Sequence, residues 1–309
     1  MLIRRADIVR WPVEAQDDAL VASYSSPINP RLRGSLGIVC RSLPMQTLLK
    51  TVLPVGVQHL LKRWFRQSAC YEQPKIPVQG YEVLSGEVPG EPNHGWQVPD
   101  VAKRQLAAFT PILRQMRAGK LREDLSALVE AIRMTQMDNP LVVEVGCGSA
   151  WNKEVLGKFS HTTVRYVGLD YGIEMLKTAR TTYPGIATLV GDAAELPFRN
   201  RSIDILVSGT LLMHLMSYEK AIEESRRVSK RWCIFHTVPV LQTRETTVLR
   251  KDAYGQPTLE IIFNNAELHA IFTANRLRVC AAIDSVPYDL QPVLGEPTVT
   301  KTFVCEVMD

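Results

Sequence analysis

The sequence predicts an α/β protein built on a doubly wound, mostly parallel β-sheet. From residue 141 onward, apolar strand-like runs alternate with segments of helical spacing. The runs are almost continuously apolar, which is typical of parallel strands that are covered on both faces. The first run, "LVVEVGCGSAWN" at 141–152, ends in a glycine turn that leads into a helix. A chain of 309 residues is long enough for one such domain and an extension.

The apolar periodicity places each element in turn. Five buried strands are expected at 141–145, 164–169, 186–190, 203–208 and 232–238. Helices are expected between them at 151–159, 173–182 and 218–230. An insertion follows at 239–264, where we expect a hairpin around "DAYGQP" at the ligand-binding edge. A helix at 265–276 and two further strands, at 277–286 and 300–308, end the chain.

Residues 101–309 are expected to form the main domain. Its core is 138–309, preceded by a helical lead-in at 101–137. The first lead-in helix is predicted to start from a cap at Asp100, to be interrupted by Pro111 and to end at Gly119. A second helix is predicted over 122–137.

Residues 1–100 are expected to be a mostly helical, partly irregular N-terminal extension. Residues 1–66 hold ten Lys and Arg against four Asp and Glu, and the basic amphipathic segment is 45–66. We prefer packing of its apolar face on the main domain or on a second subunit, with peripheral membrane contact as the alternative. No nucleic-acid partner is expected, because no RNA-binding module is evident. Met45 is a candidate start of translation, and neither the role of 1–100 nor the oligomeric state follows from the sequence.

Composition narrows the functional classes. No run of 18 apolar residues predicts a membrane span, and the N-terminus lacks the apolar core of a secretory signal, so a cytoplasmic protein is expected. The six cysteines are scattered and form no pair with metal-ligand spacing. We therefore expect no metal site and no disulfide framework.

Acidic residues at strand ends complete a nucleotide-binding pattern. Asp170 ends the second strand, where a carboxylate can accept both ribose hydroxyls of an adenosine. Asp192 follows the third strand, where an acid can receive the adenine amino group beside the apolar Ala193. The fourth strand ends at Ser208, and 208–214 lies at the same edge. Ligands bind at the carboxyl ends of strands in open α/β sheets, so these features converge on one crevice.

The motifs "EVGCGSA", "GLD", "GDAAELPF" and "IDILVS" resemble those of the class I S-adenosylmethionine-dependent methyltransferases, of the type 11 kind. The resemblance covers about residues 140–240 and extends loosely to the terminal strand pair. It implies a seven-stranded Rossmann-like sheet with S-adenosylmethionine as cofactor. Glu144 would lie near the methionine amino group, Gly146, Cys147 and Gly148 under the cofactor, and Tyr171 beside it.

The residue at position 151 favours this cofactor over a dinucleotide. Trp151 is the sixth residue counted from Gly146, where a dinucleotide fingerprint requires a small residue for close packing around a pyrophosphate. The third glycine of the family is Ala150, which is still small. The turn is therefore expected to allow close backbone approach without binding pyrophosphate.

Methyl transfer needs a base only where the acceptor must lose a proton, and His214 and His236 are the candidates. Arg250 and Lys251 are expected on an ordinary solvated face, with contact to an anionic acceptor as the alternative. The predicted function is methyl transfer to a small-molecule or lipid-like acceptor. The alternatives are a non-catalytic protein that binds S-adenosylmethionine or S-adenosylhomocysteine, and an NAD-dependent oxidoreductase.

Overall fold

The computed structural model describes residues 80–84 and 94–309. The chain divides after Cys70, and every described residue belongs to the second unit, Tyr71–Asp309. The predictions made for the basic segment 45–66 and for Met45 lie outside the described residues. Of the predicted extension 1–100, residues 80–84 and 94–100 are described, and they contain a short strand at Glu82–Val83, a 3₁₀ helix at His94–Gln97 and the start of a helix at Pro99. No helix within the described ranges combines the length and apolar character needed to cross a membrane.

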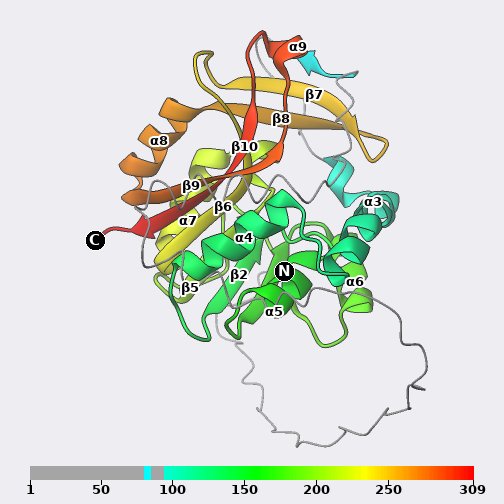
Figure 1. Ribbon diagram of the computed structural model, residues 1–309, viewed down its shortest axis with the longest axis vertical. Coiled ribbons are helices and arrows are strands. Elements are labelled where there is room, and N and C mark those ends of the chain that lie inside the picture. Colours follow the sequence, from blue (N-terminus) through cyan, green and yellow to red (C-terminus); the bar gives the residue numbers. More distant parts are fainter. Residues whose placement is uncertain (1–79, 85–93) are drawn as a thin grey trace, which may run out of the picture. The chain divides into compact units, whose positions relative to one another are not determined.

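A mostly parallel sheet forms the centre of the domain (Figure 1). Its five parallel strands are β2 (Leu141–Val145), β3 (Arg165–Asp170), β4 (Ala187–Val190), β5 (Ile203–Gly209) and β6 (Ser229–Leu241). They lie in the order β4-β3-β2-β5-β6. Antiparallel to β6 is β10 (Val299–Val307), which pairs in turn with β9 (Leu277–Pro287). The predicted parallel sheet and its terminal antiparallel pair are therefore confirmed.

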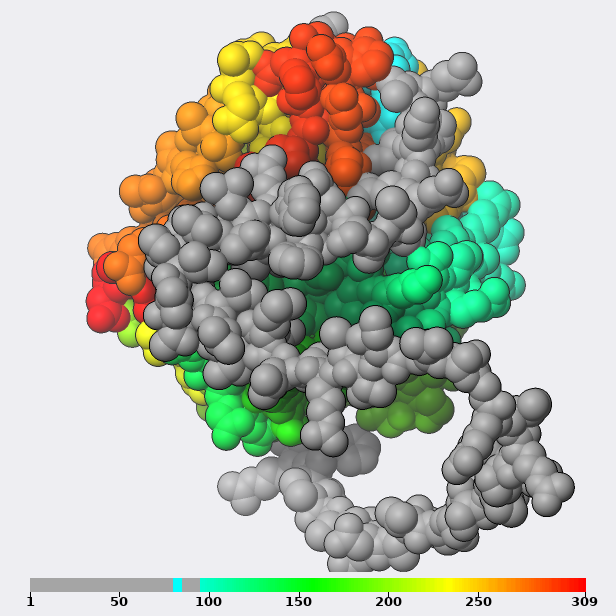
Figure 2. Space-filling view, in the orientation of Figure 1, coloured from blue at the N-terminus to red at the C-terminus, as the bar shows by residue number. Residues whose placement is uncertain are grey.

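Helices pack around this sheet. The connections contain α5 (Trp151–Phe159), α6 (Ile173–Thr182), the short 3₁₀ helix η2 (Leu212–His214), α7 (Tyr218–Val228), α8 (Asn265–Ala274) and the short α9 (Gln291–Leu294). The 3₁₀ helix η1 (His94–Gln97), α3 (Pro99–Arg117) and α4 (Glu123–Met134) precede β2, so the observed lead-in begins at residue 94 and not at the predicted 101. In Figure 2, the orange atoms of α8 lie at the left of the drawn face and the orange-red atoms of the C-terminal part at its top and left edge, whereas α3, in turquoise, lies at the right.

Two further details of the lead-in differ from the prediction. Helix α3 begins after Val98, so Asp100 lies in its first turn and is not the cap. Pro111 does not interrupt the helix. Both Pro111 and Ala107, whose carbonyl loses its partner, lie on the exposed face, where water can replace the missing hydrogen bond.

The insertion after β6 forms the predicted hairpin. Strand β7 (Thr247–Ala253) pairs antiparallel with β8 (Gln256–Asn264), and the short β1 (Glu82–Val83) pairs with the outer edge of β7. The turn residues Tyr254 and Gly255 have φ of 55° and 76°, the pair of positive angles that a type I′ hairpin turn requires. This three-stranded sheet joins β6 through β8 and extends over the ligand-binding edge.

Candidate active site

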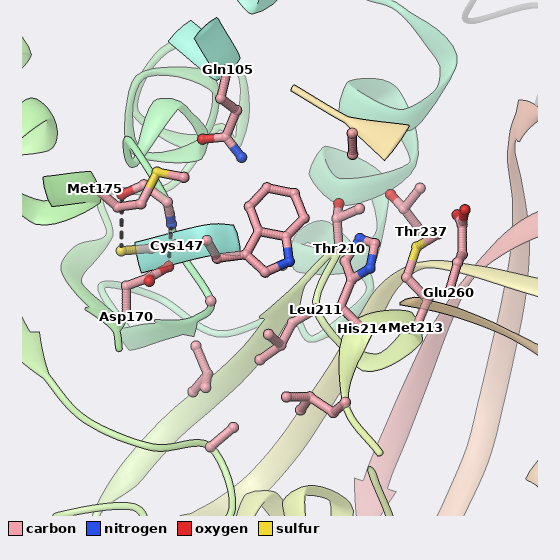
Figure 3. Close-up of a pocket in the computed structure, with 18 of the residues that line it drawn as sticks. Gln105, Cys147, Asp170, Met175, Thr210, Leu211, Met213, His214, Thr237 and Glu260 are labelled. Atoms are coloured by element: carbon pink, nitrogen blue, oxygen red, sulfur yellow. Dashed lines mark hydrogen bonds between the residues drawn. The ribbon is translucent and has the colours of Figure 1, made fainter. Parts of the chain in front are cut away.

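A cavity of about 930 Å³ lies at the carboxyl ends of the parallel strands. Its walls come from the loops after β2, β3, β4 and β5, from η1 and α3, and from the β7–β8 hairpin. Figure 3 shows two groups of side chains: Gln105, Cys147, Asp170 and Met175 on one side, and Thr210, Met213, His214, Thr237 and Glu260 on the other. We call the first group the acidic end and the second group the histidine end.

The glycine turn brings bare backbone to the acidic end. Gly146 and Gly148 have φ of 71° and 53°, in the left-handed region that favours glycine. A Cβ at Gly146 would lie 2.8 Å from the Cβ of Leu211, so no side chain fits there. The amides of Gly146 and Cys147 donate to the Leu169 carbonyl at 2.8 and 3.1 Å. The Gly148 amide donates to Asp170 Oδ2 at 2.8 Å, so all three turn amides are already bonded to β3 and its end.

Glu144 lies in the floor of the cavity, on β2. Its side chain is buried and accepts hydrogen bonds from the Asn152 amide, at 2.7 Å, and from the Tyr166 hydroxyl. Burial raises the pKa of Glu144 from 4.5 to about 7, although both hydrogen bonds oppose this shift. A Cβ at Gly209 would lie 2.2 Å from Glu144 Oε1, so the neighbouring strand must have glycine there.

Two further predicted acids line the same end. Asp170 is buried, accepts from the Gly148 and Gly172 amides at 2.8 Å each, and has its pKa raised by burial. Asp192 is exposed, and its Oδ1 accepts from the Ala194 amide at 2.8 Å. Tyr171 and Ala193 also line the cavity, as do Cys147 and the two glycines. The structure therefore brings together all the residues of the predicted cofactor site except one.

The exception is Ser208. It is buried within β5, and the lining begins at the next residue, Gly209.

The two candidate bases lie in different surroundings. His236 lies in the core with its Nδ1 2.9 Å from Thr302 Oγ1, burial lowers its pKa to about 4, and it does not line the cavity.

His214 lies in the histidine end. Its Nδ1 is 2.8 Å from the Leu259 carbonyl oxygen, and because a carbonyl only accepts, Nδ1 carries the proton of the neutral ring. The lone pair then resides on Nε2. Burial lowers the pKa of His214, which outweighs the raising effect of Glu260, so the ring is kept neutral near pH 7.

Several lining residues escaped the sequence-based prediction. At the acidic end, Gln105 Oε1 and Asn152 Oδ1 are buried and accept no hydrogen bond within the described residues. Trp96 of η1 packs beside Met175 and has its ring 5.1 Å from that of His214, so it contributes to both ends. Lys251 is mostly buried and contacts Glu260, contrary to the expected solvated face, whereas Arg250 is exposed and pairs with Glu82.

A local sequence pattern does indicate Glu260 as a site residue. It is a single acid within the apolar run "LEIIF", as Glu144 is within "LVVEV". A carboxylate in a buried strand is unfavourable unless it is paired or functional, so both positions indicate a site. Trp96 and Gln105 have no comparable signal, because only the tertiary fold brings η1 and α3 to the glycine turn.

The comparisons with known proteins agree with this geometry. Residues 143–235 match the family model described as a methyltransferase domain. A probable S-adenosylmethionine-dependent methyltransferase of Mycolicibacterium smegmatis is 29% identical over 94 residues, which are 30% of this chain and 35% of that protein. This region is a class I S-adenosylmethionine-dependent methyltransferase domain.

Other similarities cover the same region or the fold. A demethylmenaquinone methyltransferase of Paenarthrobacter aurescens is 30% identical over 89 residues, 29% of this chain and 34% of that protein. This chain spans about a third of the length of the curated relatives it matches. The 1,6-didemethyltoxoflavin-N1-methyltransferase of Burkholderia thailandensis shares the fold, with a TM-score of 0.50, 12% identity, and coverage of 76% of this chain and 99% of that one.

The acidic end of the methyltransferase domain fits S-adenosylmethionine, the cofactor of this family. The cofactor has a cationic sulfonium and an amino group, and Glu144, Asp170 and Asp192 provide carboxylates at one end of the cavity. The unsatisfied Gln105 Oε1 and Asn152 Oδ1 are acceptors suited to an amino group. A pyrophosphate fits poorly, since the three turn amides are already bonded and the carboxylates would repel it.

The side chain of Trp151 also belongs to this end. Its indole stacks on Phe109 of α3, with ring centroids 3.9 Å apart and an interplanar angle of 16°. Both rings line the cavity beside the start of α5, where a dinucleotide fold would accommodate its phosphates. The aromatic pair occupies that position with apolar surface, in agreement with the interpretation of Trp151 as unfavourable to NAD.

Proposed function

We propose that this chain is an enzyme that transfers the methyl group of S-adenosylmethionine to a small-molecule or lipid-like acceptor held in the same cavity. The observation that supports this most directly is the division of the cavity into an end with three carboxylates and an end with a neutral histidine. One end suits a cationic cofactor, and the other suits an acceptor that must give up a proton.

The acidic end would hold the cofactor. When bound, S-adenosylmethionine supplies a methyl group that is already activated, so the protein contributes mainly position and exclusion of water. Asp170 would accept the ribose hydroxyls, and Asp192 the adenine amino group beside Ala193. Glu144, Asn152 and Gln105 would surround the methionine amino group.

His214 would act as the base for an acceptor with an ionisable proton. The Leu259 carbonyl fixes the proton on Nδ1, so the lone pair of the neutral ring is on Nε2. Burial keeps the ring neutral and therefore able to accept a proton at pH 7. His236 is withdrawn from this proposal, because it lies in the core and its ring is bonded to Thr302.

Binding of S-adenosylhomocysteine by titration calorimetry tests the cofactor site. We expect wild type to bind S-adenosylhomocysteine and not NAD⁺, and the double variant Asp170→Ala/Asp192→Ala to lose about 100-fold or more in affinity, because each charge-assisted hydrogen bond contributes about 1.5–3 kcal/mol. The control is Glu130→Ala, an exposed acid on α4 paired with Arg133, which should bind as wild type does. Unchanged affinity in the double variant, or binding of NAD⁺ alone, would refute the assignment.

A second measurement separates an enzyme from a protein that only binds the cofactor. Cells with and without the gene are grown on methionine with a deuterated methyl group, and their metabolites are compared. We expect at least one small molecule that carries the label only when the gene is present. Absence of such a product, together with tight binding of S-adenosylhomocysteine, would favour the non-catalytic alternative.

A further inference from the structure

A buried ion pair closes the histidine end of the cavity. Lys251 of β7 and Glu260 of β8 are diagonal neighbours on one face of the hairpin, and Lys251 Nζ lies 2.5 Å from Glu260 Oε2. The Glu260 side chain is 0% exposed, yet both residues line the cavity. Figure 3 shows Glu260 at this end together with Thr237 and His214. Desolvation of a buried ion pair is unfavourable, so its presence at the cavity indicates a role in binding.

The donors of Lys251 are already used. Besides Glu260, its Nζ contacts the hydroxyls of Tyr81 and Tyr288 at 3.1 and 3.2 Å, and these two hydroxyls are 2.5 Å apart. An ammonium has three N–H donors, so these three partners satisfy it. Burial would lower the pKa of Lys251, but the neighbouring Glu260 outweighs it and raises the pKa, so Lys251 stays charged. No donor of Lys251 remains for an anionic ligand.

The acceptors at this end, in contrast, are not all used. A carboxylate offers about four lone-pair sites, and the described groups that bond to Glu260 are Lys251 and the Tyr288 hydroxyl. Thr237 Oγ1 is also buried, lines the cavity and has no hydrogen-bond partner among the described residues. The residue has φ of 57°, in the left-handed region that a threonine rarely adopts. Buried polar atoms without a hydrogen-bond partner can accept hydrogen bonds from a ligand.

Aromatic rings line the wall between the two ends. The Trp96 ring lies 5.1 Å from His214 and 5.8 Å from Tyr254, and all three residues line the cavity. Such rings favour flat or cationic partners. The histidine end therefore combines an aromatic wall with a carboxylate.

We propose that Glu260, assisted by Thr237, recognises the methyl acceptor, and that the acceptor is a small ring compound that presents N–H or O–H donors and carries no negative charge. The inference rests on the proposed function, since it assumes that the histidine end holds the acceptor. Carboxylates and phosphates are disfavoured, because the Lys251–Glu260 pair has no net positive charge to attract them and Lys251 has no donor left to offer.

Three probes of one size test the charge preference. Benzamidine is cationic with several donors, benzamide is neutral with two, and benzoate is anionic with none. We expect ligand-observed NMR titration of the full chain to rank benzamidine first, benzamide second and benzoate last. In Glu260→Gln, which keeps one carbonyl acceptor, benzamidine should bind at least about tenfold more weakly. The matched control Glu130→Gln, an exposed acid on α4, should reproduce the wild-type ranking.

Two results of these titrations would contradict the inference. Binding of benzoate as tight as that of benzamidine, or unchanged benzamidine affinity in Glu260→Gln, overturns the inference. Because Glu260→Gln leaves Lys251 buried without its counter-charge, the double variant Lys251→Met/Glu260→Gln, which removes both charges, must show the same loss of benzamidine. Titrations without and with saturating S-adenosylhomocysteine separate the two hypotheses. Failure of S-adenosylhomocysteine to bind refutes the proposed function. If S-adenosylhomocysteine binds, the probe ranking alone decides this inference.

Discussion

Glu144 shows how the burial of one carboxylate affects stability. Its pKa is raised to about 7 by burial, whereas in the unfolded chain it should ionise near 4.5. Between these values the folded protein keeps a proton that the unfolded chain has released. The free energy of unfolding therefore falls as pH rises through this window, and above pH 7 the full cost, about 3 kcal/mol, is present. Below pH 4.5 both states are protonated and the contribution vanishes.

The variant Glu144→Gln should remove this cost. We expect it to be more stable than wild type at pH 8 by up to about 3 kcal/mol, with a much smaller gain at pH 5. Its amide oxygen can still accept from Tyr166, and Asn152 can rotate its amide to match. Urea unfolding at the two pH values measures the difference, and Glu130→Gln should show none. Equal stability of wild type and Glu144→Gln at pH 8 would disprove the burial argument.

The same variant should bind S-adenosylhomocysteine more weakly. A residue that destabilises the fold is retained where it serves a site, and Glu144 is in reach of the cavity. In wild type, a bound amino group would stabilise the ionised carboxylate. Residues that lower stability and raise affinity are thus expected at this end of the cavity.

At the scale of elements, the β7–β8 hairpin forms part of the wall of the histidine end. Its turn depends on Gly255, whose φ is 76°, and the Tyr254 carbonyl beside it accepts from Arg104 of α3 at 3.0 Å. A Cβ at Gly255 would lie 2.0 Å from Arg104 Nη1, so a side chain there must displace the Arg104 guanidinium. The hairpin also carries Lys251 and Glu260, so its position determines the shape of the proposed acceptor site.

We expect Gly255→Ala to weaken benzamidine binding several-fold and to leave S-adenosylhomocysteine affinity within about twofold of wild type. The stability loss should be about 1 kcal/mol, from the positive φ. Gly185→Ala is the matched control, because Gly185 has φ of 79° and open space around it, and it lies in the turn before β4, at the opposite edge of the sheet. Equal effects of the two variants on benzamidine would show that the hairpin does not shape the site.

The sequence predicts those elements that are determined by a local residue pattern, and not those that depend on tertiary contacts. Strand β2 was predicted at its observed bounds and the other parallel strands to within a few residues, because buried strands are continuous apolar runs. That Asp170 and Asp192 line one cavity could also be predicted, since the carboxyl ends of parallel strands meet at one edge. Pro111 was misread because its helix-breaking cost depends on which face it occupies, which local sequence does not reveal.

Much of the histidine end beyond His214 and Glu260 could not be predicted, for the same reason. Tyr81, Lys251 and Tyr288 come from distant parts of the chain and meet only after the hairpin folds over the sheet edge. Thr237 lines the cavity whereas the neighbouring His236 lies in the core, and the positive φ of Thr237 has no sequence signal in threonine. Local patterns therefore predict most of the acidic end, whereas tertiary structure decides most of the histidine end.

At the scale of the whole domain, the cavity joins segments that are otherwise remote. A Cβ at Gly148 would lie 3.0 Å from Gln105 Oε1 of α3, so the lead-in helix covers the glycine turn. Trp96 of η1 packs beside Met175 of α6. A cofactor in the acidic end would therefore contact the lead-in as well as the strand ends, and its binding energy would be shared across them.

Hydrogen exchange measures this coupling. On addition of S-adenosylhomocysteine, we expect amides in 94–110 to exchange at least about tenfold more slowly, in step with amides of the glycine turn 146–152, because local opening of η1 and α3 would have to break ligand contacts. Helix α8 does not line the cavity and should exchange at an unchanged rate. In Asp170→Ala/Asp192→Ala both protected regions should lose their protection together. Protection confined to 141–217 would instead mean that η1 and α3 stand apart from the cofactor, and that Gln105 and Trp96 serve the fold alone.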